Sequence, residues 1–507
     1  MISRKSRLGT DAKVAVLGAG PGGLAAAHYL ASRGTPTHTF ESNPYIGGLC
    51  VTLEQGGFRF DLGGHRWFTK NPELHQWLLR LMEGELVTVQ RTSRIYFDRK
   101  FYNYPISPMN VLKNTGVING AHAVLSYIKA CLAGLVTSEP PANLKAAFTA
   151  QFGNQIFEQF FRRYTEKVWG RPCEEISADW ASQRTKGLSL LTNILDALIK
   201  SRNVVSLVDE FVYPRDGYQR ICDRMAEDIE AKGHPIDLSS PVTSLIYDGP
   251  NDFRVVYKTP TGETEVKATE VISTIPLTHL VRMLKPACPP NVTEAAKALK
   301  FRDLITVTVM LRKQSVTSDT WLYVHDEKLL FARLHEPKNW SPALVPGDEF
   351  TSLVCECFCS HDEPIWAMTD EEISDRVISD LVNELGFIET DEVIDTCVVR
   401  TRRAYPIYDL EYKDRVKLLY DFVGRHKGLH AVGRGGAFRY NNADHSIEMG
   451  QLLAKRLLGE DTDHMSVNTK QEYLEEIRVS LATAEDRAFE DRGTRAGDEA
   501  VVEKPAE

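Results

Sequence analysis

The sequence lacks the features that mark nucleic-acid-binding, disulfide-stabilised and repeat proteins. Its 507 residues carry a net charge of −9, with a pI near 5.9. No excess of basic charge is available to neutralise phosphates, so we expect no nucleic-acid partner. The nine cysteines are scattered and do not suggest a disulfide framework. With 43% hydrophobic residues, the chain can bury a large core, divided among about two or three domains.

Zinc-type cysteine spacing is also missing. Cys355, Cys357 and Cys359 stand at alternate positions in "SLVCECFCS". Alternate residues of a strand point to one face, whereas a zinc site uses the CxxC spacing of a turn. We therefore predict a packed strand face and no metal, with a metal site as the alternative.

Long apolar runs are scarce. Residues 120–136, "GAHAVLSYIKACLAGLV", include His122 and Lys129 and are short for a membrane span, so we expect a buried or surface-docked helix and no integral membrane segment. The start, "MISRKSRLGTDAK", does not resemble a signal peptide, and we expect a cytoplasmic protein. The charged segment 480–507 is predicted to be disordered.

A dinucleotide-binding motif stands near the start, in "KVAVLGAGPGGLAAAHYLASRG". A Val-rich strand leads into a turn and an Ala/Leu-rich helix that ends near Gly34. In such a turn the first glycine permits the tight bend, the second lets the backbone approach a pyrophosphate, and the third allows close packing of helix on strand. The candidate cofactor contacts here are Gly18, Gly20, Gly22 and Gly23, with Glu41 at the end of the next strand as the ribose acceptor.

Further features favour FAD over NAD. Gly47 and Gly48 follow Glu41, which resembles the extended fingerprint of glutathione-reductase-type flavoproteins, although the pair could merely form a turn. Near the other end, "GLHAVGRGGAFRYNNADHSIEMGQLLAKRLLG" predicts a strand up to Gly433, a turn and a helix whose first N–H groups could meet a flavin carbonyl. The candidates there are Gly433, Asp444, His445 and Ser446, and the resemblance implies that Val242 meets the adenine.

These motifs predict an α/β fold. We expect a Rossmann-like FAD-binding domain of the glutathione reductase type, with an inserted mixed α+β substrate domain and a helical subdomain. The FAD domain is discontinuous and comprises residues 11–65, 221–276 and 425–460. Residues 66–220 form a largely helical insert, and residues 277–424 form a sheet-containing substrate domain.

The substrate regions resemble the UDP-galactopyranose mutase branch of the amine oxidase and protoporphyrinogen oxidase superfamily. "RYTEKVWG" at 163–170 is similar to the mutase motif GYTEKQWG, and "YPRDGYQRIC", "LKFRDL" and "GRGGAFRYNNADHS" are similar to further mutase segments. The resemblance implies that Tyr164 stacks on uracil, that Trp169 lines the sugar pocket and that Arg184 lies on a loop closing over the diphosphate. It also implies substrate contacts by Arg302, Arg333 and Arg439, and a place beside the flavin for His65. Tyr405 is a further aromatic candidate.

These residue types suit a nucleotide diphosphate sugar, because guanidinium groups bind phosphate oxygens bidentately and rings stack on bases. The first hypothesis is therefore a mutase that interconverts pyranose and furanose rings, which in the resembling family proceeds through a flavin N5–sugar adduct, with Arg333, Arg439 and His65 as the catalytic candidates. The second hypothesis is an FAD-dependent oxidoreductase with hydride transfer to flavin. "GGHRWFT" at 63–69 and "STIPLTHL" at 273–280 depart from the mutase pattern and favour the second. A homo-oligomer is left open.

Overall fold

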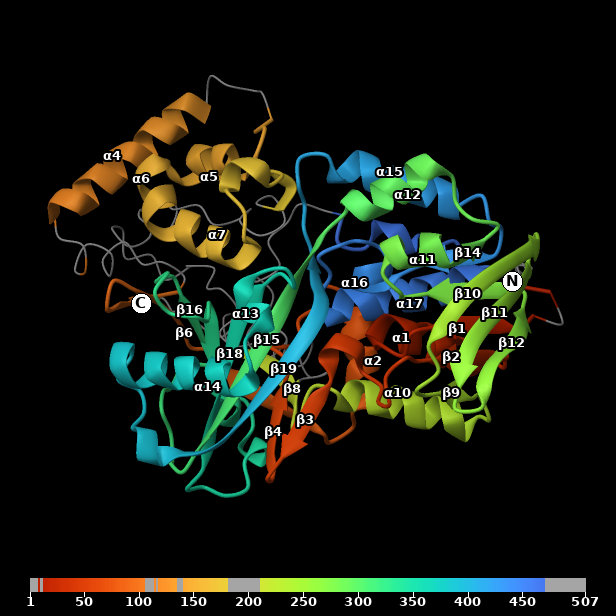
Figure 1. The fold of residues 1–507 in the computed structure, drawn as a ribbon, viewed down its shortest axis with the longest axis horizontal. Helices are drawn as coiled ribbons and strands as arrows, with labels where there is room; N and C mark the ends of the chain where they lie inside the picture. The colour runs from red at the N-terminus through yellow and green to blue at the C-terminus, as the bar shows by residue number, and fades with distance from the viewer. Residues whose placement is uncertain are drawn as a thin grey trace, which may run out of the picture.

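The computed structural model describes residues 8–9, 12–104, 114, 117–134, 140–180 and 210–469. Figure 1 shows a group of helices at one corner of the molecule, a large sheet below it, and a second body of sheets and helices on the other side. Arg184 and the segment 480–507 lie outside the described residues, so the predictions made for them stay predictions. Within the described part of the chain, no helix combines the length and the apolar character that crossing a membrane requires.

The dinucleotide-type body is built on a five-stranded sheet in which every neighbouring pair is parallel. Its strands, in spatial order, are β20 (Leu429–Ala431), β13 (Glu270–Ser273), β1 (Val14–Leu17), β2 (Thr37–Phe40) and β9 (Ile236–Asp237). Strand β1 is buried along its whole length, as a strand covered on both faces must be. Strands far apart in the sequence therefore meet in one sheet, and all of them come from the segments assigned above to FAD binding.

Helix α1 (Pro21–Ala31) follows β1 and packs against α17 (Ala443–Leu457) and α10 (Arg220–Ala231). The contact between α1 and α17 is close because Gly22 and Gly450 face each other. A Cβ atom on Gly450 would lie 2.2 Å from the carbonyl oxygen of Gly22 and 3.0 Å from the amide nitrogen of Ala26. The two ends of the sequence are thus held together by a contact between backbones.

Gly450→Ala is expected to destabilise the protein by about 1–3 kcal/mol, because the added methyl group must push the two helices apart. Urea denaturation followed by circular dichroism measures the effect. Gly249→Ala is the control, since a Cβ atom at Gly249 would meet no atom within 4 Å. Equal unfolding midpoints for the two variants would contradict the close approach of α1 and α17.

A four-stranded sheet lies beside this body, in the order β12 (Gly262–Ala268), β11 (Asp252–Thr259), β10 (Val242–Gly249) and β14 (Leu284–Lys285). Helices α11 (Leu277–Met283), α12 (Pro290–Ala298) and α15 (Tyr412–Val423) pack against one another. Figure 1 shows α12 and α15 above α11, which lies beside β10 and β14. Val242 begins β10, where it packs at the edge of a hydrophobic cluster.

The substrate side is a seven-stranded sheet. Its order is β19 (Val393–Pro406), β15 (Phe301–Leu311), β18 (Thr351–Cys359), β17 (Arg333–His335), β16 (Trp321–Val324), β6 (Ser93–Phe97) and β7 (Lys100–Asn103). Cys355, Cys357 and Cys359 are buried with residues of α14 (Asp370–Ser379), which confirms the predicted packed strand face. Because strand side chains alternate, Glu356 and Phe358 face the other way.

Helices α4 (Val117–Gly134), α5 (Leu144–Phe152), α6 (Asn154–Ile156), η2 (Phe157–Arg162) and α7 (Arg163–Trp169) form the corner group in Figure 1. Helix α7 ends at Gly170, whose φ of 63° is the left-handed conformation that glycine adopts easily. A shared core of α5, α7 and the sheet includes Phe148, Trp169 and Phe358. The group is thereby fixed over the face of β18 that carries Glu356.

Other short elements complete the described chain. They are η1 (Gly48–Cys50), β3 (Thr52–Gln55), β4 (Phe58–Asp61), α2 (Pro72–Leu81), β5 (Leu86–Gln90), η3 (Cys173–Glu175), β8 (Glu210–Pro214), η4 (Pro337–Asn339), η5 (Pro342–Leu344), α13 (Pro364–Ala367), η6 (Asp380–Glu384), η7 (Thr390–Glu392), α16 (Gly433–Gly436) and η8 (His464–Ser466).

Candidate functional site

The predicted glycine turns converge at the amino end of α1. A Cβ atom built on Gly48 would lie 3.3 Å from the Cα atom of Gly20, and one on Gly22 would lie 3.5 Å from the Cα atom of Gly433. Gly18 has a φ of 104°, and Gly47 and Gly433 also have positive φ angles. Three segments that are distant in sequence thus bring bare backbone to one place.

This place fits the pyrophosphate of a dinucleotide. Gly20 is the N-cap of α1 and has no capping side chain, so the first N–H groups of the helix are available to an anion. A Cβ atom at Gly20 would meet only the Cα atom of Gly48, at 3.9 Å. The protein therefore leaves open the space in front of Gly20, as close approach by a ligand requires.

Glu41 lies beside the same turn. One of its carboxylate oxygens accepts a hydrogen bond from the amide of Ala19 at 2.9 Å, and the other accepts from the amide of Asn43 at 2.9 Å. Glu41 is almost fully buried, at 6% exposure. These bonds fix the carboxylate at the end of β2, where the sequence predicts the ribose contact.

The beginning of α17 borders the turn from the other side. A Cβ atom on Gly22 would lie 3.1 Å from the carbonyl oxygen of Ser446. The side chains of Ser446 and His445 make hydrogen bonds within the first turn of α17. The Ser446 hydroxyl donates to the carbonyl of Asn442, and His445 accepts from the amide of Asn442. Burial raises the pKa of Asp444 to about 7.

A second cluster surrounds the guanidinium group of Arg333 on β17. Its Nε atom donates to the hydroxyl of Tyr164 at 3.0 Å. Its central carbon lies 4.6 Å from the ring centre of Phe358 and 5.9 Å from that of Tyr405. The packing of α7, β17 and β19 thus brings the predicted Tyr164, Arg333 and Tyr405 together in one place.

Glu356 supports this cluster from β18, and the sequence did not point to it. A carboxylate oxygen lies 3.5 Å from Nη1 of Arg333, and the other accepts from the amide of Gly64 at 3.3 Å. Glu356 is completely buried, and this burial raises the pKa of its carboxyl group. Glu356 therefore links Arg333 to the segment that carries His65.

Tyr164 is held from both sides. Its ring stacks on His325 at 4.6 Å and meets Tyr323 edge-on at 5.8 Å. On the same helix, the amino group of Lys167 donates to the carbonyls of Asp326 and Phe331, at 2.7 Å each. These bonds tie α7 to the loop that leads into β17, so Tyr164 and Arg333 keep a fixed relative position.

Trp169 ends the same helix and is 3% exposed. It meets Trp180, Tyr405 and Tyr440 edge-on, with ring centres 5.8, 6.5 and 6.0 Å away. Its indole nitrogen is buried and has no hydrogen-bond acceptor among the described residues. Trp169 therefore forms the back of the aromatic cluster that includes Tyr405.

Arg434 takes the place that the sequence reasoning gave to Arg439. Its central carbon lies 5.0 Å from the ring centre of Tyr405 and 5.5 Å from that of Tyr440. Its Nε atom donates to the carbonyl of Asn441 at 2.7 Å, and Nη1 donates to that of Ala404 at 3.1 Å. Arg333 and Arg434 thus share the ring of Tyr405.

Arg439 points elsewhere. Its Nη1 atom donates to the carbonyls of Met465 and Val467, at 2.7 and 3.0 Å. Within the described ranges, no hydrogen bond joins Arg439 to Arg333, Tyr164 or Tyr405. Both arginines follow Gly433 within a few residues, and the sequence offers no signal to choose between them, because α16 decides their directions.

Arg302 is occupied by the protein itself. Its guanidinium group donates to the carbonyls of Val168 and Phe358, at 2.9 and 3.0 Å, and it pairs with Glu363. It is 3% exposed. Arg302 thus joins the end of α7 to β18, and we assign it a role in holding Tyr164 and Trp169 in place.

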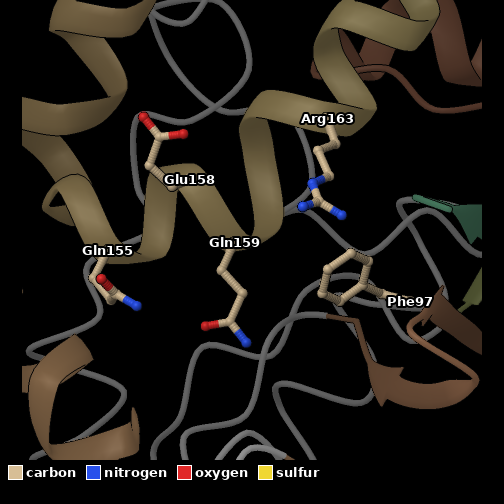
Figure 2. Close-up of a pocket in the computed structure, with 5 residues that line it drawn as sticks. All are labelled: Phe97, Gln155, Glu158, Gln159 and Arg163. Carbon is tan, nitrogen blue, oxygen red and sulfur yellow. The ribbon is translucent and has the colours of Figure 1, made fainter. Parts of the chain in front are cut away.

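An open pocket lies between the helical group and the end of β6, and Figure 2 shows the five side chains that line it. They are Phe97, Gln155, Glu158, Gln159 and Arg163. The guanidinium carbon of Arg163 lies 5.7 Å from the ring centre of Phe97, and Arg163 points toward that ring in Figure 2. None of the predicted site residues lines this pocket, so it is separate from the cluster around Arg333.

His65 lies on the far side of Glu356, where its ring stacks on Tyr218 at 5.2 Å. Burial, and next the charge of Arg434, lower the pKa of His65 from 6.5 to about 3. The imidazole is therefore neutral at physiological pH and cannot act as a proton donor from the imidazolium form.

His65→Gln is expected to make the protein less sensitive to acid. Because the folded-state pKa lies below the unfolded value, the unfolded chain binds one more proton as the pH falls below 6.5, and stability is lost in that direction. Between about pH 4 and 6, the variant should lose about 1.4 kcal/mol less per pH unit than the wild type. Urea denaturation at several pH values measures the two slopes, and identical slopes would refute a neutral buried His65.

Solved structures share this fold. The crystal structure of reduced UDP-galactopyranose mutase matches with a TM-score of 0.78 and 21% identity, covering 91% of this chain and 96% of that chain. A putative protoporphyrinogen oxidase from Exiguobacterium sp. 255-15 matches with a TM-score of 0.68 and 16% identity, covering 88% and 99%. At these identities the likeness shows the fold alone, and it confirms the predicted α/β fold with a Rossmann-like domain.

Sequence relatives include the inactive all-trans-retinol 13,14-reductase of Danio rerio, 24% identical over 87% of this chain and 78% of that protein. A 1-hydroxycarotenoid 3,4-desaturase of Flavobacterium sp. (strain P99-3) is 42% identical over 66 residues, which are 13% of this chain and 14% of that protein. The family described as flavin containing amine oxidoreductase matches residues 21–413. With the glycine turns that fit a dinucleotide, this match confirms FAD as the cofactor. The chain belongs to the flavin-containing amine oxidoreductase family.

Proposed function

We propose that this flavoenzyme is a mutase acting on a nucleotide diphosphate sugar. The observation that carries the proposal is a pair of guanidinium groups. The central carbons of Arg333 and Arg434 lie 5.9 and 5.0 Å from the centre of the same Tyr405 ring. Two fixed cations beside aromatic rings suit a diphosphate joined to a base and a sugar. Among the described residues, Arg333 pairs with Glu356 and Arg434 donates to carbonyl groups and pairs with no carboxylate. A purely apolar substrate would therefore leave the charge of Arg434 without an anion from this part of the chain.

The reduced flavin would supply a nucleophile for the anomeric carbon of the sugar. The protein's own part is to hold the diphosphate while its bond to the sugar is open, so that the same oxygen can return. Arg333 is suited to this task because Tyr164 and Glu356 fix its guanidinium group. Trp169, Tyr405 and Tyr440 would cover the sugar and exclude water.

Tyr164 would contact the nucleotide end. Stacking of a base on an aromatic ring contributes about 1–3 kcal/mol, and the stacked His325 holds the Tyr164 ring in one orientation. Burial raises the pKa of the Tyr164 hydroxyl, so the phenol stays neutral and donates or accepts a hydrogen bond without adding negative charge near a diphosphate. Arg184, which lies outside the described residues, is retained as a proposed diphosphate contact.

A second candidate is an FAD-dependent oxidoreductase. It is favoured by the Danio rerio relative, which is named as an inactive retinol reductase and aligns with 87% of this chain, and by the desaturase named above. In this reading the aromatic cluster would bind an unsaturated or amine substrate and orient it for hydride transfer. The neutral His65 and the buried Glu356 would then adjust the polarity around the flavin.

Titration with UDP separates these candidates at the level of binding. Isothermal titration calorimetry of the purified holoprotein should give a dissociation constant in about the micromolar range, as contacts to both phosphates and the base imply. Tyr164→Ala should weaken UDP itself about tenfold or more, since it removes the stacking platform. A wild-type protein that does not bind UDP would reject a uridine nucleotide sugar as the substrate and favour the oxidoreductase reading.

A further inference from the structure

Helix α4 exposes apolar side chains on the face that points away from the protein. Leu125, Ile128 and Leu132 are 63%, 45% and 60% exposed. Their spacing of three and four residues places them in one stripe on the helix. Among the described residues they are three of the seven large hydrophobic side chains that are exposed, and the other four are dispersed over different elements.

The opposite face of α4 is packed against the protein. Ala123 and Tyr127 are 6% and 5% exposed, and α4 packs against α5 and α6. Figure 1 shows α4 along the outer edge of the helical group, with α5 and α6 on its inner side. A surface helix normally carries polar residues on its outer face, so an apolar stripe that the described residues leave uncovered is a candidate binding surface.

The charges around the stripe indicate which partner. The helix itself, residues 117–134, contains Lys129 and no aspartate or glutamate, although the chain as a whole has 69 acidic residues and a net charge of −9. Within α4 the exposed Lys129 borders the stripe by helical spacing. An apolar stripe bordered by a lysine, on a helix without acidic residues, is typical of helices that lie in the headgroup region of a membrane.

We propose that the outer face of α4 docks on an anionic lipid surface, with Leu125, Ile128 and Leu132 entering the boundary between headgroups and acyl chains. Lys129 contacts the lipid phosphates. A second copy of the chain fits less well, because three side chains cover far less than the roughly 800 Å² per partner of a stable dimer. A twofold pairing of this face would also bring Lys129 of both copies into the same patch.

Vesicle co-sedimentation of the full holoprotein tests the proposal. Vesicles of equal parts phosphatidylcholine and phosphatidylglycerol should bind the wild type, and vesicles of phosphatidylcholine alone should bind it more weakly. The double variant Leu125→Gln, Leu132→Gln should reduce binding about tenfold or more. Lys129→Glu, which changes only an exposed side chain, should reduce it about tenfold. Leu410→Gln is the matched control, since Leu410 is 56% exposed in the turn that precedes α15.

Flavin content and circular dichroism of each variant establish that it is folded. Loss of binding in the α4 variants with retention in Leu410→Gln would support the proposal. A wild type that stays in the supernatant, or α4 variants that bind like the wild type, would overturn it. A dimer formed through this face would also overturn it. Sedimentation velocity would then show a dimer for the wild type and a monomer for the double variant Leu125→Gln, Leu132→Gln.

Discussion

Gly20→Val is expected to yield a folded protein that purifies without FAD. In the structure a Cβ atom at Gly20 meets no protein atom closer than 3.9 Å, and the φ and ψ of −80° and 176° suit any residue. The fold itself therefore tolerates a side chain there. The side chain would instead occupy the space in front of the first N–H groups of α1, where the pyrophosphate must approach. We expect FAD affinity to fall about a hundredfold or more.

The absorbance ratio of flavin to protein, measured on freshly purified variants, gives the occupancy. Gly249→Val is the matched control, because it introduces the same side chain at a position with no atom within 4 Å and far from the turn in sequence. The control should be yellow and Gly20→Val colourless, with equal circular dichroism. Full occupancy in Gly20→Val would place the pyrophosphate elsewhere.

Arg333→Ala is expected to weaken the binding of a nucleotide diphosphate by about 2–5 kcal/mol, as the removal of a buried charged contact does. The same change leaves Glu356 buried without its cation, which costs stability in its own right. The double variant Arg333→Ala, Glu356→Gln removes this uncompensated charge and should recover stability without recovering affinity. That separation distinguishes a binding role of Arg333 from a structural one.

Arg434→Ala should also weaken the binding of UDP. Arg439→Ala should leave UDP affinity within about threefold of the wild type, because Arg439 contacts the backbone of Met465 and Val467 instead of the ring cluster. UDP titrations of the three single variants measure these differences. If Arg439→Ala lost affinity and Arg434→Ala kept it, our assignment of the second cation would be wrong.

Features that are local in sequence could be predicted. The turn from Gly18 to Gly23 is fixed by consecutive residues between a strand and a helix, and the alternate cysteines of β18 show which face is packed. Arg333 and Tyr164 were found through resemblance, since no local pattern brings together residues 169 positions apart.

What could not be predicted depends on the directions of side chains. Arg434 and Arg439 stand in one glycine-rich segment, and only the path of α16 decides which of them reaches Tyr405. Arg302 has the residue type of a phosphate contact, but Glu363 and the carbonyls at the end of α7 take up its guanidinium group. Glu356 is an acidic residue between cysteines in the sequence, and its contact with Arg333 arises only when β17 and β18 pair.

Anaerobic incubation of the flavin-reduced protein with UDP-galactopyranose tests the central proposal most directly. The sugar products are separated by chromatography while the flavin absorbance is recorded. A mutase should convert the pyranose to a furanose over many turnovers while the flavin stays reduced, with no net electron transfer. No conversion by the reduced protein with this or other nucleotide sugars, together with stoichiometric flavin reduction when the oxidised protein meets an amine or an unsaturated substrate, would contradict the mutase proposal and identify an oxidoreductase.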